Sequence, residues 1–205
     1  MFSTLIEFYF YLKKKYPNYD HQWSLWLKKK KKDREREEII IGAILTQRTN
    51  WKNVEKAFEK LKKERANSLK KIFYLKIKKL EKIIFPAGFY KAKARYLFNF
   101  SKFFVENYSS IKALKKEPFL SLREKFLKIK GIGPETADSI LLYALDKPVF
   151  VIDEYTRRFV LKYHLFPSLK YHHLQEFFQK NLKRNFRLYQ EFHALIVIAG
   201  KNKEF

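Results

Sequence analysis

Apolar residues recur at helical spacing along nearly the whole chain, and this pattern predicts an all-α protein. The segment 39–47, IIIGAILTQ, is apolar almost all round, which is typical of a buried central helix. The next helix has apolar residues at positions i, i+3, i+4 and i+7, which are Val54, Ala57, Phe58 and Leu61.

The same spacing predicts later helices. One starts near Tyr90 and has its apolar face at Ala94, Leu97 and Phe98. The last has on one face Leu188, Phe192, Leu195, Ile196 and Ala199. The chain has only five glycines, six prolines and no Asn-Gly or Asp-Gly turn. We therefore expect about nine or ten helices, with no repeats and no long linker.

Two of the apolar helical stretches are joined by the segment 130–134, KGIGP. The Gly-Ile-Gly turn needs little side-chain room, so its backbone N–H groups can approach an anion closely. Pro134 suits the first position of a helix, where a missing N–H group has no cost. The pattern predicts a helix-hairpin-helix at about residues 120–146 that binds a phosphate backbone. The candidate phosphate-binding residues of the turn are Lys130, Gly131, Ile132 and Gly133, with the Ile132 side chain tucked against its own helices.

The charge of the chain supports a polyanionic partner. The net charge is +24 at pH 7, from 45 Lys and Arg against 21 Asp and Glu. AT-rich coding is an alternative source of the lysines, because Phe, Tyr, Ile and Asn are also abundant. The run Lys28–Lys32 has two readings as well, a solvated loop leading into a helix or a direct DNA contact. The charge and the hairpin together support a nucleic-acid partner more strongly than either feature does alone.

The sequence excludes cysteine-based sites and disfavours a membrane or secreted protein. The chain has no cysteine, so disulfides, thiolate metal sites and iron-sulfur clusters are excluded. No apolar run reaches the roughly 18–20 residues needed to span a bilayer. The apolar N-terminal segment Met1–Leu12 lacks a basic leader and a cleavage site of small residues. We therefore expect a soluble cytoplasmic protein without a membrane partner.

Four motifs in order identify a family resemblance: IIIGAILTQRTNW, GFYKAKA, KGIGPETAD and VFVIDEYTRR. Over roughly residues 30–200 the chain resembles the endonuclease-III-like superfamily of DNA base-excision glycosylases, most of all the cluster-free bacterial 3-methyladenine type. The resemblance implies a two-lobed, all-α helix-hairpin-helix glycosylase fold without an iron-sulfur cluster and with the active-site cleft between the lobes. One lobe would span residues 33–146, and the other would combine 1–32 with 147–205.

The resemblance implies that Asp153 is the catalytic residue. Breaking an N-glycosidic bond builds positive charge on the sugar, and an ionised carboxylate in a partly dry cleft would stabilise that charge and orient water. Aspartate is also a favoured N-cap. Asp153 precedes a helix that carries Phe159, Val160 and Tyr163, so capping is a second, compatible role.

A departure from the family pattern concerns strand cleavage. Bifunctional relatives form a Schiff base through a lysine two positions after the second hairpin glycine, and this position is Glu135 here. A carboxylate cannot form an imine, so we expect a monofunctional enzyme that leaves an abasic site. Lys130 is the alternative amine, before the turn.

Further residues are assigned by position. Gln47 matches the family residue that fills the gap left by an extruded base, although a solvent-exposed glutamine at a helix end is the alternative. Arg48 follows on the same surface as a candidate phosphate contact. Trp23, Trp26 and Trp51 are candidates for stacking on the base, and ordinary core packing is the alternative for each.

The expected substrate is double-stranded DNA with a damaged base, most of all an alkylated purine such as 3-methyladenine. We expect a monomer, nucleoid-associated in a bacterial or archaeal cell. We expect no cofactor and no metal bound through side chains. Binding of a monovalent cation by the backbone carbonyl groups of the hairpin is an open alternative. The alternatives are a glycosylase for hypoxanthine, uracil or thymine glycol, with or without lyase activity, and a non-catalytic DNA-binding protein. A structure-specific nuclease is a weaker one, because no acidic cluster surrounds Asp153.

Overall fold

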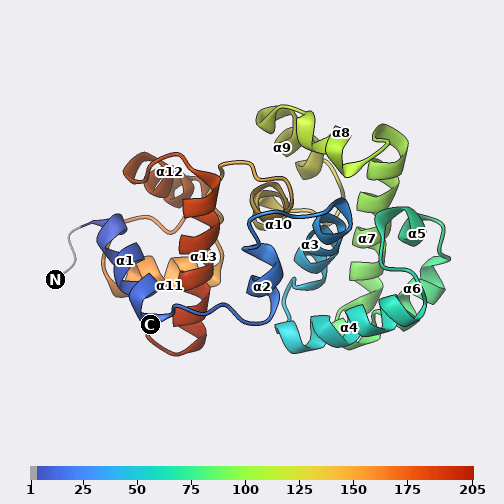
Figure 1. The fold of residues 1–205 in the computed structure, drawn as a ribbon, viewed down its shortest axis with the longest axis horizontal. Coiled ribbons are helices and arrows are strands. Elements are labelled where there is room, and N and C mark those ends of the chain that lie inside the picture. Colours follow the sequence, from blue (N-terminus) through green and yellow to red (C-terminus); the bar gives the residue numbers. More distant parts are fainter. Residues whose placement is uncertain (1–3) are drawn as a thin grey trace. The chain divides into compact units, whose positions relative to one another are not determined.

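The computed structural model describes residues 4–205, and these residues fold into helices without any strand (Figure 1). The all-α prediction is therefore confirmed. The expected nine or ten helices were too few, since thirteen α-helices form in this part of the chain. Five of them span only five to seven residues: α2 (Gln22–Trp26), α5 (Leu69–Phe73), α6 (Ile77–Ile83), α8 (Ile111–Lys116) and α10 (Pro134–Ser139). The last of these is the predicted second helix of the hairpin, and the other four are too short to show a helical period. None of the described helices has both the length and the apolar character needed to cross a bilayer.

The chain divides into two compact units, and each is described here by itself. The first is the segment Lys29–Ile140, called the hairpin unit below. The second, called the terminal unit, combines the chain up to Lys28 with Leu141–Phe205. The predicted lobe boundaries, at residues 33 and 146, lie within six residues of these.

The hairpin unit is built around α3 (Asp33–Leu45). Its residues Ile39–Leu45 are buried on every side, as the apolar run predicted. The long helix α7 (Tyr90–Asn107) packs against α3, α5 and α6, and α4 (Trp51–Lys63) packs against the short turn Phe85–Ala87 (Figure 1). The inner face of α4 is buried at the four predicted positions Val54, Ala57, Phe58 and Leu61. This core fixes the helices that support the hairpin.

The predicted hairpin connects α9 (Phe119–Leu127) to α10. A buried ion pair joins the two helices, because the Arg123 guanidinium donates from Nε to Oδ1 of Asp138 at 2.7 Å and from its terminal nitrogen to Oδ2 at 3.0 Å. The Asp138 carboxylate is fully buried, so this two-point contact replaces the water that it loses. The pair fixes the spacing of the helices on either side of the turn.

Side chains from α7 and from the end of α3 hold the turn itself. Gly131 has a φ of +98°, and its backbone lies against the ring of Tyr96, with no space for a Cβ atom. Asn99 donates its amide N–H to the carbonyl oxygen of Lys130 at 3.0 Å. Gln47 donates to the carbonyl oxygen of Gly131 at 3.0 Å and to Oγ1 of Thr136 at 2.9 Å. The turn is therefore shaped by contacts from outside the hairpin sequence as well as by its glycines.

The terminal unit is built around α13 (Phe186–Lys201), which packs against α1 (Leu5–Lys15) and α11 (Glu154–Lys162) (Figure 1). Aromatic rings fill its core, with Phe150 stacked on Phe178 at a centroid distance of 4.2 Å and edge-on to Phe192. Phe178 comes from α12 (Tyr171–Asn181). This packing places α13 next to the start of α11.

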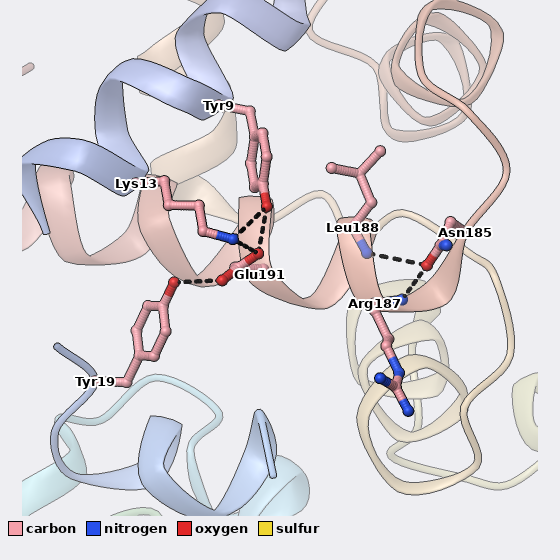
Figure 2. Close-up of polar contacts among 7 residues, drawn as sticks. All are labelled: Tyr9, Lys13, Tyr19, Asn185, Arg187, Leu188 and Glu191. Atoms are coloured by element: carbon pink, nitrogen blue, oxygen red, sulfur yellow. Dashed lines mark hydrogen bonds and ion pairs between the residues drawn. The ribbon is translucent and has the colours of Figure 1, made fainter. Parts of the chain in front are cut away.

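A polar cluster ties the N-terminal segment to α13 (Figure 2). The Glu191 carboxylate accepts hydrogen bonds from the hydroxyls of Tyr9 and Tyr19, the latter at 2.7 Å, and pairs with Lys13 Nζ at 2.9 Å. Burial alone would raise the pKa of Glu191, but these three donors hold it below its ordinary value of 4.5. The carboxylate is therefore charged in the folded protein at neutral pH.

The lowered pKa of Glu191 predicts a pH-dependent contribution to stability. The contribution is present above the unfolded pKa and is lost as the pH falls through the folded pKa. We expect Glu191→Gln to lower the free energy of unfolding by about 1–2 kcal/mol at pH 7. We also expect the variant to lose less stability than the wild type below about pH 5, measured by denaturant unfolding. Glu106→Gln, which breaks an exposed i,i+4 pair with Lys102, should change stability by less than about 0.5 kcal/mol.

We expect the substitution of glycine by alanine to change stability differently at the two glycines of the hairpin. At Gly131 a new Cβ would lie 1.9 Å from a ring carbon of Tyr96, and the backbone conformation is strained for any L side chain. We expect Gly131→Ala to destabilise the protein by about 2 kcal/mol or more, measured by denaturant unfolding. Gly133→Ala is the matched control, because no atom lies within 4 Å of its Cβ position and its φ is −88°. Equal stability of the two variants would contradict this account of the turn.

Candidate active site

Asp153 is the N-cap of α11, as the sequence predicted. Its carboxylate oxygen Oδ1 accepts two hydrogen bonds from Thr156, one from the backbone N–H at 2.8 Å and one from the hydroxyl at 2.9 Å. The helix that follows buries Phe159 and Val160. The preceding residues, Val149–Ile152, are buried as well, so the carboxylate sits at a rigid junction. Capping thus fixes the direction of the side chain and leaves Oδ2 for other contacts.

The second oxygen of Asp153 faces a histidine. Oδ2 lies 3.5 Å from Nε2 of His193, and the two side chains are 17% and 6% exposed. Burial alone would raise the pKa of Asp153, but the charge and hydrogen bonding of His193 and the two donors of Thr156 outweigh it and lower that pKa. Asp153 is therefore an ionised carboxylate with little solvent around it.

His193 is in turn held by Tyr143. The Tyr143 hydroxyl oxygen lies 2.7 Å from Nδ1 of His193 and 3.0 Å from the backbone carbonyl oxygen of Gln190. Burial, and then the negative charge of Asp153, raise the pKa of Tyr143 well above its ordinary value, so the hydroxyl stays neutral. Neither residue was predicted from the sequence. The available signal was one histidine inside the apolar run of the last helix.

Two of the predicted tryptophans lie against the aromatic residues Tyr143 and His193. The Trp23 ring centroid is 6.3 Å from that of His193 and 5.7 Å from that of Tyr143, and Trp26 lies 5.0 Å from Tyr143. Both indoles are about 95% buried, packed edge to face against each other. The fold thus brings Trp23 next to His193, the partner of Asp153, and Trp26 next to Tyr143. Base stacking by these rings stays a prediction.

The other predicted residues belong to the hairpin unit. Trp51 is the first residue of α4, and its ring lies 6.4 Å from that of Phe58. Arg48 is exposed, with a φ of +51°. The side-chain amide of Gln47 is bonded to the hairpin, so its insertion into a duplex would require these two hydrogen bonds to break.

Within the turn, Lys130, Gly133 and Glu135 are exposed, whereas Ile132 is 3% exposed. The backbone N–H of Ile132 donates to the carbonyl oxygen of Ile129 at 3.0 Å. The buried side chain agrees with the expectation that Ile132 is tucked against its own helices, and the phosphate-binding role of the turn residues stays a prediction. No group of three His, Cys, Asp or Glu side chains in residues 4–205 is arranged to hold a metal ion.

Comparison with known sequences identifies relatives. The profile of the HhH-GPD superfamily of base excision DNA repair proteins matches residues 41–184. A Methanocaldococcus jannaschii protein, provisionally described as a DNA repair glycosylase, is 47% identical over 165 residues, which cover 79% of this chain and 75% of the relative. Endonuclease III of Thermotoga maritima is 30% identical over 120 residues, 58% of this chain and 53% of that protein.

Solved structures give the same assignment. The 3-methyladenine DNA glycosylase of H. pylori, bound to 1,N6-ethenoadenine, superposes with a TM-score of 0.78 at 32% identity, over 98% of this chain and 99% of that one. A DNA complex of endonuclease III superposes with a TM-score of 0.74 at 16% identity, over 98% of this chain and 87% of that one, which shows the fold alone. The matched profile includes both the hairpin and Asp153, and the chain belongs to the HhH-GPD superfamily of base excision DNA repair proteins.

Proposed function

We propose that this DNA repair glycosylase hydrolyses the N-glycosidic bond of an alkylated purine and leaves the DNA strand intact. The observation that supports it most is the Asp153 carboxylate, which stays ionised although it is largely buried. One of its oxygens is bonded to Thr156 and the other faces His193. A carboxylate held in this way is suited to stabilise a cationic transition state.

In the proposed reaction, the bond between the base nitrogen and the sugar carbon C1′ breaks, and its electron pair leaves with the base. Positive charge then develops on the sugar, and the Asp153 carboxylate stabilises it by charge. The oxygen of a water molecule bonds to C1′ and gives up a proton to the carboxylate. The base must first leave the stack, because C1′ and its bond to the base are inaccessible inside a duplex.

The aromatic residues favour an alkylated purine as the substrate. A purine alkylated on its ring is cationic and is already a good leaving group, so it needs aromatic faces more than a strong general acid. A cation–π contact with tryptophan contributes about 0.5–2 kcal/mol. Trp23 lies beside His193, Trp26 lies beside Tyr143, and Trp51 is the third candidate. The similarity to the H. pylori 3-methyladenine glycosylase, at 32% identity, supports the same choice.

The hairpin and the basic character of the chain support DNA as the partner. Lys130 and Gly133 are exposed at the turn, and Arg48 is exposed beyond the end of α3. Lysine and arginine neutralise phosphates, and the glycine backbone allows close approach. With a net charge of +24, the protein should bind duplex DNA through its backbone. A monovalent cation on the hairpin carbonyls stays a prediction.

The first test is base release by Asp153→Asn. Asparagine is as good an N-cap as aspartate, so the fold and the affinity for DNA should persist. We expect the rate of 3-methyladenine release from methylated duplex DNA, measured by chromatography, to fall by about 100-fold or more, because the charge that stabilises the transition state is lost. Asp33→Asn, at an exposed position in α3, is the matched control and should leave the rate unchanged.

The outcomes separate the alternatives. Release of hypoxanthine, uracil or thymine glycol in place of an alkylpurine would overturn the substrate and keep the glycosylase. An absence of base release by the wild type on all of these substrates, with DNA affinity retained, would indicate a DNA-binding protein without catalysis. Undiminished activity of Asp153→Asn would remove Asp153 from the mechanism.

The second test concerns strand cleavage. Glu135 occupies the position of the lysine that forms a Schiff base in bifunctional relatives, and a carboxylate cannot form an imine. We expect the wild type to produce strand breaks only after alkali treatment and to give no covalent DNA complex with borohydride. Breaks without alkali, together with a trapped complex, would identify an amine such as Lys130 as a nucleophile.

A further inference from the structure

Three side chains from different elements, Tyr143, His193 and Asp153, lie in successive polar contact. Tyr143 lies in the π-helical turn Ile140–Ala144, His193 in the middle of α13, and Asp153 at the start of α11. The hydroxyl of Tyr143 is 2.7 Å from Nδ1 of His193, and Nε2 of His193 is 3.5 Å from Oδ2 of Asp153. The base excision chemistry proposed above assigns no role to the first two residues.

The hydrogen-bond donors and acceptors restrict where the protons can be. The Tyr143 hydroxyl has one proton and two acceptors in reach, the Gln190 carbonyl oxygen at 3.0 Å and Nδ1 of His193 at 2.7 Å. If the hydroxyl donates to Nδ1, the neutral imidazole has its proton on Nε2. If it donates to Gln190, Nδ1 must itself donate to the hydroxyl oxygen.

In that second arrangement a neutral imidazole would direct the lone pair of Nε2 at a negatively charged oxygen. The arrangement is favourable only when Nε2 is protonated too, as in the imidazolium ion. Both favourable arrangements therefore direct an N–H from Nε2 toward Oδ2 of Asp153. Nε2 is buried and has no hydrogen-bond partner within standard geometry among the described residues, and Oδ2 of Asp153 is the charged oxygen that it faces. The 3.5 Å contact is long, as such contacts often are before substrate binds.

We propose that His193 is a positioning residue for Asp153: its Nε2–H holds Oδ2 while Thr156 holds Oδ1, so that the carboxylate keeps one orientation and its negative charge in the closed, poorly solvated site. The inference rests on the proposed glycosylase function, because it assigns His193 a part in that reaction. His193 itself touches neither the sugar nor the base in this account.

The other ionisable groups on the packed elements are engaged elsewhere. Glu191, two positions before His193, lies on the opposite side of α13 and is bonded to residues of the N-terminal segment. Asp146 lies 3.5 Å from the Gln190 amide, and Arg157 of α11 donates to the carbonyl oxygen of Leu169. Tyr143 stays neutral because its pKa is raised. His193 is thus the group that acts most strongly to lower the pKa of Asp153.

The experiment compares His193→Phe and His193→Gln with the wild type in single-turnover base release from methylated DNA across pH 4–9. Phenylalanine removes the donor, whereas the glutamine amide can still donate a hydrogen bond without titrating. We expect His193→Phe to release base about 10- to 100-fold more slowly at neutral pH with unchanged DNA affinity, because the carboxylate is no longer held. Glutamine should restore most of this loss. His172→Phe and His172→Gln, at an exposed position of α12, are the matched controls.

The pH profile separates positioning from a merely structural role. Without His193, burial raises the pKa of Asp153 with less opposition, so the acid limb of the rate profile should move up by about one pH unit or more. A slower His193→Phe whose acid limb stays at the wild-type pH, or a variant as fast as the wild type, overturns the inference. If His193→Phe does not fold, His193→Gln decides: near wild-type rate with a raised acid limb supports the inference, and an unmoved limb overturns it. Absence of base release by the wild type would instead overturn the proposed function, and the inference with it.

Discussion

The chemistry proposed for this protein depends on keeping the Asp153 carboxylate charged where there is little water. Removing a charged group from solvent is strongly unfavourable unless hydrogen bonds and an opposite charge replace the lost hydration. One oxygen of Asp153 accepts two hydrogen bonds from Thr156, and the other oxygen faces Nε2 of His193. The helix cap and the candidate catalytic group are thus the same side chain, so the start of α11 and the geometry of the site are set together.

The terminal unit is organised to keep His193 in place. Its helix α13 is buried along most of its length, and the Glu191 cluster anchors the opposite side of that helix to α1 and to Tyr19 (Figure 2). Tyr143 comes from a π-helical turn, a feature that often marks functional sites because it shifts side chains out of the regular helical register. The aromatic core around Phe150 then limits how far these elements can move.

The hairpin unit meets a different constraint, because the turn that is proposed to bind a phosphate through its backbone must keep its shape. Gly131 lies against Tyr96 in a conformation that other residues rarely adopt, and Asn99 and Gln47 bind the carbonyl groups of the turn. Their hydrogen bonds satisfy the carbonyl groups of Lys130 and Gly131. The side of the turn that includes Lys130 and Gly133 stays exposed.

The sequence by itself determined the helices with a clear apolar face, the hairpin, the N-cap at Asp153 and the family, because each depends on neighbouring residues or on short ordered motifs. It did not reveal four of the five shortest helices, α2, α5, α6 and α8, which are shorter than two turns and show no period. Nor did it reveal Tyr96 as the neighbour of Gly131, Tyr143 as the partner of His193, or His193 as the partner of Asp153. These pairs are separated by 35, 50 and 40 residues along the chain, and only tertiary packing brings them into contact. A buried charge is stabilised by whatever lies next to it in space, and that is decided by the fold.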